Sequence, residues 1–263
     1  MLFRSYVQLS LRPVQGVTLS GGVRHDDYST YGGHTTFGGN LAWSLNGGAT
    51  VLRATYAEGF RAPTLTEGQP PYGNTELKPE TARNVDLGIE QSLLDNRVRL
   101  GLTWFNRRST DLIVYSFSAG RSENIGRVDA EGLEFALRIE PTDRLRVEAN
   151  YTLTDAFNRS GSFNGKRLQL RPQHSGSFSI DWATPLGLNL GATALLIGDS
   201  FDDQANLVPL DGYALVTLRA SLPIGDKLEL YGRVENLTDA QYETVAGYGT
   251  YGRAAYAGVR VKW

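Results

Sequence analysis

Apolar and polar residues alternate over most of this 263-residue chain. In LEFALRIE (133–140) every second residue is apolar, and RLRVEANYTLT (144–154) repeats the pattern. Successive side chains of a β-strand point to opposite faces, so the alternation predicts strands with one apolar and one polar face. Helical periodicity is nearly absent, and we therefore expect an all-β protein.

The alternation divides the chain into about thirteen predicted strands. Many of them exceed ten residues, whereas strands of globular sheets usually have about five or six. We expect Leu133, Phe135, Leu137 and Ile139 to face outward, and Glu134, Arg138 and Glu140 to face the opposite side. The predicted strands are 4–12, 17–28, 34–45, 49–60, 81–92, 97–109, 127–140, 144–157, 170–183, 187–198, 212–222, 227–238 and 253–263.

The connections between these strands alternate between short and long. Such an asymmetry between the two ends is typical of an antiparallel up-and-down transmembrane β-barrel. A soluble β-sandwich also has one apolar and one polar face, but it needs turns every 8–12 residues or so. The short connections are 13–16, 46–48, 94–96, 141–143, 184–187 and 223–226. The long connections, at the opposite end, are 61–80, 110–126, 158–169, 199–211 and 239–252. The connection 29–33 belongs to the same end but is brief.

Three tryptophans support the barrel. Trp43, Trp182 and Trp263 each stand at the short-turn end of a predicted strand, on its apolar face. Aromatic rings at such a level are typical of a membrane–water interface, so we predict that these three anchor the sheet there. Trp104 lies further along its strand, toward the long loops.

Composition excludes several classes of protein. Lys and Arg total 26 against 28 Asp and Glu, so the net charge of −2 gives no basic footprint for nucleic acid. The chain has no cysteine, hence no disulfide and no thiolate metal site. It contains no apolar run of about 20 residues, and the first residues do not resemble a signal peptide.

Motif searches do not favour an enzyme. GYGTYG (247–252) fits a dinucleotide motif, but a predicted strand follows it instead of a helix. The three histidines are scattered, and no Ser/His/Asp set is indicated. Loop 199–206, DSFDDQAN, has oxygen ligands that can bind Ca²⁺, although its spacing matches no EF-hand. We expect no enzyme activity, no cofactor and no metal.

Several stretches resemble the C-terminal half of a TonB-dependent outer-membrane receptor in both order and spacing. Within that family, GDSFDDQANLVPLDGY (198–213) and the terminal block are most similar to cobalamin (vitamin B12) receptors. The stretches are TYAEGFRAPTLTEG (55–68), NTELKPETARNVDLGIE (74–90), ENIGRVDAEGLEFAL (123–137), LRPQHSGSFSIDW (170–182), DGYALVTLRASL (211–222) and RVENLTDAQYETVAGYGTYGR (233–253).

The resemblance implies energised uptake of a scarce ligand across the outer membrane of a Gram-negative bacterium. The favoured ligand is cobalamin. The alternatives are a ferric siderophore or haem as ligand, or a passive porin-like pore. Such receptors have roughly 22 strands around a plug. Residues 1–263 would be the C-terminal part of that barrel, without the plug domain and TonB box, and we expect them not to transport alone. The expected partners are membrane lipid, the ligand, and TonB acting through the missing plug.

Ligand recognition is expected in the long loops, because loops carried on a rigid scaffold commonly bind ligands. Aromatic and charged side chains in 61–80, 110–126, 199–211 and 239–252 suit this role. The candidate ligand-binding residues are Arg61, Tyr72, Tyr115, Asp202, Asp203, Tyr248 and Tyr251.

Overall fold

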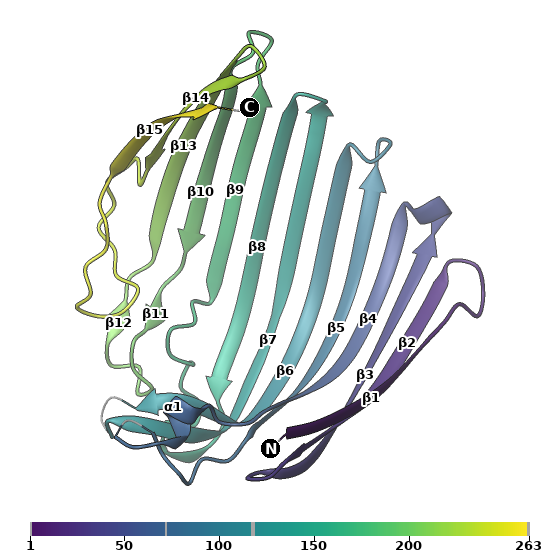
Figure 1. Cartoon of the computed structure of the whole chain (residues 1–263), viewed down its shortest axis with the longest axis vertical. Coiled ribbons are helices and arrows are strands. Elements are labelled where there is room, and N and C mark those ends of the chain that lie inside the picture. Colours follow the sequence, from purple (N-terminus) through teal and green to yellow (C-terminus); the bar gives the residue numbers. More distant parts are fainter. Residues whose placement is uncertain (1, 72, 117–118, 262–263) are drawn as a thin grey trace. The chain divides into compact units, whose positions relative to one another are not determined.

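The computed structural model describes residues 2–71, 73–116 and 119–261 (Figure 1). Thirteen strands form one antiparallel sheet, in which chain order is spatial order. Its strands are β1 (Leu2–Leu11), β2 (Val17–Tyr28), β3 (Gly32–Leu45), β4 (Thr50–Arg61), β5 (Glu80–Leu93), β6 (Val98–Ser116), β7 (Arg121–Thr142), β8 (Leu145–Asn158), β9 (His174–Ala183), β10 (Asn189–Ile197), β13 (Tyr213–Ile224), β14 (Leu228–Glu235) and β15 (Ala254–Val261).

The other elements are short and lie in the connections. β11 (Ser200–Phe201) and β12 (Pro209–Leu210) pair with each other, and α1 (Leu65–Gly68) follows β4. Single 3₁₀ turns occur at Asn46–Gly48 and Gly161–Phe163. Over the described residues, no helix has the length and apolar character needed to cross a membrane.

The chain divides into two compact units. Unit 1 comprises the segment up to Ile89, Thr103–Gly132 and Asp155–Leu168. Unit 2 comprises Glu90–Leu102, Leu133–Thr154 and the segment from Gln169 onward.

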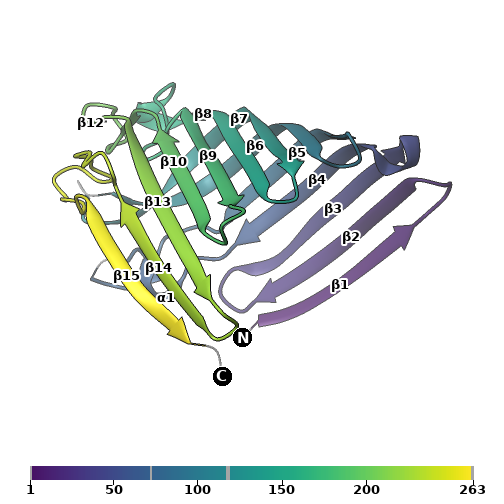
Figure 2. The same cartoon turned by 90° about the horizontal axis from the view of Figure 1, so that it is seen from above.

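Unit 1 contains the ladder β1–β4, whose strands lie side by side in both views (Figures 1 and 2). Register places Trp43 opposite Leu52 and Leu41 opposite Ala54, so these apolar side chains share one face. On the other face, the buried Asp26 accepts from Arg4 and, at 2.7 Å, from Arg24. The two faces therefore differ as the alternation predicts.

Unit 2 contains the ladder from β8 to β15, and one row across it shows the apolar face. Val147, Ile180, Ala192, Leu218, Val234 and Ala255 are successive cross-strand partners in this row.

The next row of unit 2 lies on the polar face. Its successive partners are Arg146, Asp181, Gly191, Arg219, Arg233 and Tyr256. Arg219 reaches over Gly191 and donates to Asp181 at 2.6 Å. A Cβ at Gly191 would lie 2.4 Å from the Arg219 Nε, so a side chain there would displace Arg219 from its present position.

Burial in the described residues argues against the sandwich. The buried apolar residues are Leu77, Ile113, Ile125, Val128, Ala156 and Leu210, all toward the long-loop ends of the strands or in those loops. Leu133 is 41% exposed and Phe135 is 38% exposed. The described part of the chain thus has one sheet layer with exposed apolar side chains, as expected when lipid replaces a packed core.

Several predicted strand boundaries are wrong. Residues 110–126 are not a long loop, because β6 continues to Ser116 and β7 begins at Arg121. Ile113, Ile125 and Val128 are buried there, and their packing extends the hairpin beyond the alternating pattern. The ninth strand begins at His174 instead of 170, because Leu170 adopts a positive φ of 54°.

The predicted anchors Trp43 and Trp182 lie within two residues of the short-turn ends of β3 and β9. Their exposed fractions are 44% and 45%. Trp263 lies outside the described residues, so its anchoring role stays a prediction.

The two faces can be distinguished by introducing a charge. We expect Phe135→Arg to destabilise the protein in lipid vesicles by about 2–4 kcal/mol, because a lipid-facing arginine loses its hydration. The control is Glu134→Arg, one residue earlier on the opposite face, which should cost much less. Reversible denaturant unfolding measures both variants. Equal losses would contradict the assignment of faces.

Candidate ligand-binding loops

Arg61 organises the connection that follows β4. Its Nε and Nη2 donate to the Glu80 carboxylate at 2.8 and 2.7 Å, and its Nη1 donates to Glu67 at 2.8 Å. Glu80 also accepts from the backbone N–H of Ile113 at 2.7 Å. One guanidinium therefore links the end of β4, α1 and the start of β5, and Glu80 extends the link to β6.

The short helix α1 forms because its sequence provides its own cap. Thr64 Oγ1 accepts from the Glu67 N–H, and the Glu67 carboxylate accepts from the Thr64 N–H at 2.8 Å, which completes a capping box. Burial tends to raise the pKa of Glu67. The hydrogen bonds from Arg61 and Thr64 outweigh that burial, so its pKa lies below the usual value.

Asn124 fixes the second half of the same connection. Its side-chain amide exchanges two hydrogen bonds with the backbone of Lys78, at 2.8 and 2.9 Å. The same amide donates to the carbonyl of Asp111 at 2.7 Å. These bonds hold the segment beside the buried Leu77 and order it without a further strand.

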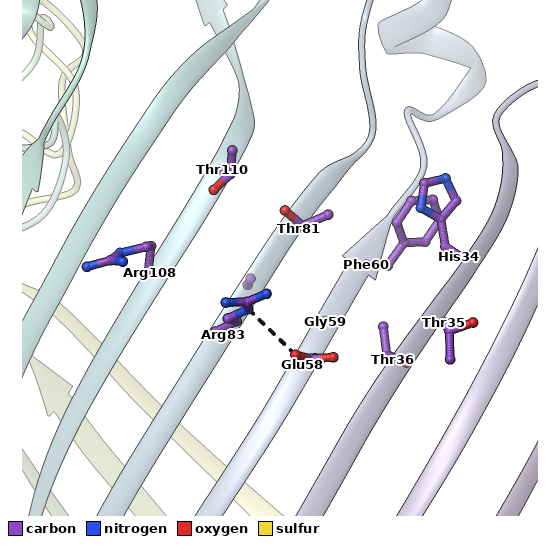
Figure 3. Close-up of a pocket in the computed structure, with 11 residues that line it drawn as sticks. His34, Thr35, Thr36, Glu58, Gly59, Phe60, Thr81, Arg83, Arg108 and Thr110 are labelled. Atoms are coloured by element: carbon purple, nitrogen blue, oxygen red, sulfur yellow. Dashed lines mark ion pairs between the residues drawn. The ribbon is translucent and has the colours of Figure 1, made fainter.

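An aromatic cluster lies near the connection between β2 and β3. The rings of His34 and Phe60 stack with centroids 3.8 Å apart (Figure 3), and Tyr28 lies 5.6 Å from Phe60. His34 Nε2 is 2.9 Å from the Tyr31 carbonyl. Our sequence reasoning missed this cluster, although Tyr28, Tyr31 and His34 around one brief connection were a detectable signal.

Asp203 shapes the connection between β11 and β12 in unit 2. Its carboxylate accepts from the backbone N–H groups of Ala205 at 3.0 Å, Leu207 at 2.8 Å and Val208 at 2.8 Å. Burial tends to raise the pKa of Asp203, but these backbone hydrogen bonds outweigh burial and lower it. Asp202 accepts from the Ala246 N–H at 3.3 Å, which connects this loop to 239–252.

The predicted strand 227–238 ends at Glu235, because the ENLTD stretch turns there. Asn236 is buried, with a φ of 46°. Its amide accepts from the Ala240 N–H at 2.8 Å and donates to the Ala240 carbonyl at 3.0 Å. It also donates to the carbonyl of Tyr251 at 3.4 Å, so one side chain joins both ends of loop 239–252.

The candidate ligand-binding residues fall into two groups. Arg61, Asp202 and Asp203 direct their polar atoms toward their own loops or a neighbouring loop. Tyr248 and Tyr251 expose 70% and 92% of their surface.

The remaining two candidates are Tyr115 and Tyr72. Tyr115 near the end of β6 is 39% exposed, and Tyr72 lies outside the described residues. Ligand contact by all seven candidates stays a prediction.

The expectation of no metal also stays a prediction, with Ca²⁺ at 199–206 as its alternative. Among the residues with described placement, no three His, Asp or Glu side chains are grouped to hold a metal ion. An ion bound at Asp203 would compete with three backbone N–H groups for its oxygens.

A family comparison bears directly on this sheet and its loops. The model of the TonB dependent receptor-like β-barrel family matches residues 3–237. The chain belongs to this family. Its members are outer-membrane receptors and transporters rather than enzymes, which confirms the general class expected from the sequence.

Solved structures show the same fold. A mutant of the ferric enterobactin receptor PfeA of Pseudomonas aeruginosa is 23% identical, with a TM-score of 0.82 over 99% of this chain and 44% of its own. The siderophore receptor PiuA of Acinetobacter baumannii is 20% identical, with a TM-score of 0.81 over 99% of this chain and 43% of its own. The siderophore receptor PirA of Pseudomonas aeruginosa is 24% identical, with a TM-score of 0.77 over 99% of this chain and 46% of its own. The chain spans less than half the length of each.

We predict that Arg61→Gln loosens α1 and the segment after it. Loss of the bonds to Glu67 and Glu80 should lower the local opening free energy by about 1 kcal/mol, since the side chains are partly exposed. Hydrogen exchange at the Gly68 amide measures this opening. The control Arg83→Gln removes a single 3.5 Å ion pair to Glu58 and should leave that exchange unchanged. Equal acceleration in both variants would disprove the clamp.

The loop closed by Asp203 should open in acid. A lowered folded-state pKa means that the carboxylate stabilises this loop fully above its unfolded pKa of about 4. The contribution is lost as the pH falls through the lower folded value. Asp203→Ala should remove protection of the Leu207 and Val208 amides at every pH, as measured by hydrogen exchange. Asp226→Ala, in a short turn, is the control, and unchanged protection in Asp203→Ala would refute the assignment.

Proposed function

We propose that this chain forms the sheet and ligand-selecting loops of an outer-membrane receptor that takes up a ferric siderophore. The observation that carries the proposal is the family match combined with solved structures whose names identify siderophore receptors. One such structure of PfeA contains enterobactin. Uptake would be driven by TonB through a plug domain.

The exposed loop aromatics suit this cargo. Tyr248 and Tyr251 present large, stiff rings, and stacking against a planar catecholate is worth about 0.5–1.5 kcal/mol per ring pair beyond simple burial. Asn236 and Asp202 hold their loop through backbone contacts. A loop ordered before binding loses less conformational entropy when the ligand arrives.

The same contacts weaken the case for cobalamin. That reading depended on the 198–213 stretch, in which Asp202 and Asp203 were candidate ligand contacts. Both carboxylates accept backbone hydrogen bonds, so loop architecture accounts for the residues without a corrinoid. The comparisons favour the siderophore alternative, and a receptor family favours gated uptake over a passive pore.

The test measures ligand binding to cells that display the protein with a plug domain. We expect a ferric tris-catecholate to bind and cyanocobalamin not to compete. Tyr248→Ala combined with Tyr251→Ala should weaken binding about tenfold, because two stacking contacts are lost. Tyr151→Ala, in the middle of β8, is the control and should bind normally. Competition by cyanocobalamin without tris-catecholate binding would restore the cobalamin reading.

A further inference from the structure

The apolar-bearing face of unit 1 becomes charged toward the long-loop end. Alternate residues of a strand share a face, so Arg108 lies on the same side of β6 as Trp104, and Arg83 lies on the same side of β5 as Leu87. Each arginine stands four residues beyond its apolar counterpart, about 13 Å along the strand. Figure 3 shows Arg83 and Arg108 on neighbouring strands with Glu58 beside Arg83.

Three arginines converge on one carboxylate at this level. Asp129 on β7 accepts from Arg108 Nε at 3.1 Å and from Arg127 Nε and Nη2 at 2.9 and 2.5 Å. Arg159 Nε lies 3.8 Å from the same carboxylate, and its guanidinium also covers the Phe157 ring at 5.0 Å. Asp129 is therefore shared by three guanidinium groups.

Arg83 is the most loosely held of these arginines. It forms an ion pair with Glu58 at 3.5 Å, and its side chain is 74% exposed. Glu58 also accepts from the Tyr56 hydroxyl at 2.6 Å and from the Phe37 N–H at 3.2 Å. The carboxylate is therefore shared, and most of the Arg83 donor capacity faces outward.

Other carboxylates on this face lie closer to the apolar side chains. Glu131 stands four residues from Arg127 and accepts from Trp104 Nε1 at 3.0 Å and from Asn106 at 3.3 Å. Asp155 stands four residues from Arg159 on β8. The charges are thus layered, with the arginines as the outer layer.

A hollow of about 360 Å³ lies beside Arg83, Arg108 and the Glu58 carboxylate. Its lining includes Arg83 and Arg108, together with the hydroxyl-bearing Thr81 and Thr110 (Figure 3). Guanidinium groups bind phosphate through paired hydrogen bonds, and threonine hydroxyls donate to the same oxygens. The hollow has the size and the donors for one phosphate group.

We propose that Arg83, Arg108, Arg127 and Arg159, here called the arginine cluster, bind the phosphate of a phosphorylated lipid headgroup. On a lipid-facing surface, side chains beyond the apolar and aromatic level meet the headgroup layer. A free phosphate ion has the same charge chemistry. Continuity of the cluster with the apolar face favours a lipid, whose chains would lie against Leu87 and Trp104. This site is independent of the transported ligand.

A purely structural network does not account for the arrangement. Like charges that face each other in a sheet are destabilising, yet the backbone N–H of Arg159, directly after β8, donates to the Arg127 carbonyl of β7 at 2.8 Å. Arg127 supplies two hydrogen bonds to Asp129, and Arg108 supplies a third. Arg108 and Arg159 are additional positive charges that an anionic ligand would balance.

The test variant is Arg108→Gln with Arg159→Gln, which keeps the Arg127–Asp129 pair and its contribution to the fold. The probes, added to the purified protein in neutral detergent, are diphosphorylated lipid A, the same lipid without phosphates, and inorganic phosphate. Native mass spectrometry measures binding. We expect the phosphorylated lipid to bind at least tenfold more tightly than the dephosphorylated one, and the double variant to lose about tenfold.

Two further variants separate binding from stability. Arg107→Gln, the neighbour of Arg108 on the opposite face, should bind like the wild type. Asp129→Asn removes the competing carboxylate and should bind the phosphorylated lipid more tightly, whereas a structural network would only be weakened.

Three outcomes would overturn the proposal. They are equal binding of both lipids, equal losses in Arg107→Gln and the double variant, and displacement of the lipid by an equal concentration of inorganic phosphate. The last outcome would identify a free anion site instead.

Discussion

Backbone hydrogen bonding in hydrocarbon is the constraint on which this structure depends. Water cannot satisfy a peptide group there, and each unpaired N–H or C=O costs several kcal/mol. Long antiparallel strands satisfy their peptide groups, because each strand pairs along most of its length with the strands beside it. Side chains are then free to serve the two environments, apolar on one face and charged on the other.

The polar face is built from ion pairs that reach across strands. Arg219 crosses the bare backbone of Gly191 to reach Asp181. In the same unit, Glu140 accepts from both Arg138 and Arg146, at 2.6 and 2.9 Å. Because these groups alternate with lipid-facing residues, a shift of one residue in register would turn them toward the membrane. The ion pairs on the polar face therefore favour one register of strand pairing, and that register in turn keeps the charged side chains away from lipid.

The alternation predicted the strands well where one face is apolar and the other charged, as around Phe135. It failed at residues 110–126, since Ile113 and Ile125 are buried by packing at the loop end rather than exposed to lipid. The loops were predictable in position but not in shape. Nothing local in the sequence indicates that Asn124 would hold the backbone of Lys78, 46 residues away, or that Arg61 would bind Glu80. Such contacts arise only after the strands have set the distance.

The loop closed by Asp203 has a consequence for how receptors of this kind diversify. Asp202 donates its N–H to the Val208 carbonyl at 2.9 Å, and Phe201 pairs with Pro209 beneath it. With Asp203 accepting three amides, most of the hydrogen bonds that close this segment lie within it. Recombination could replace it without redesigning the strands, provided that the new sequence brings its own internal cap. The strands would keep their pairing through such an exchange, because the bonds that close the loop lie mainly within the loop itself.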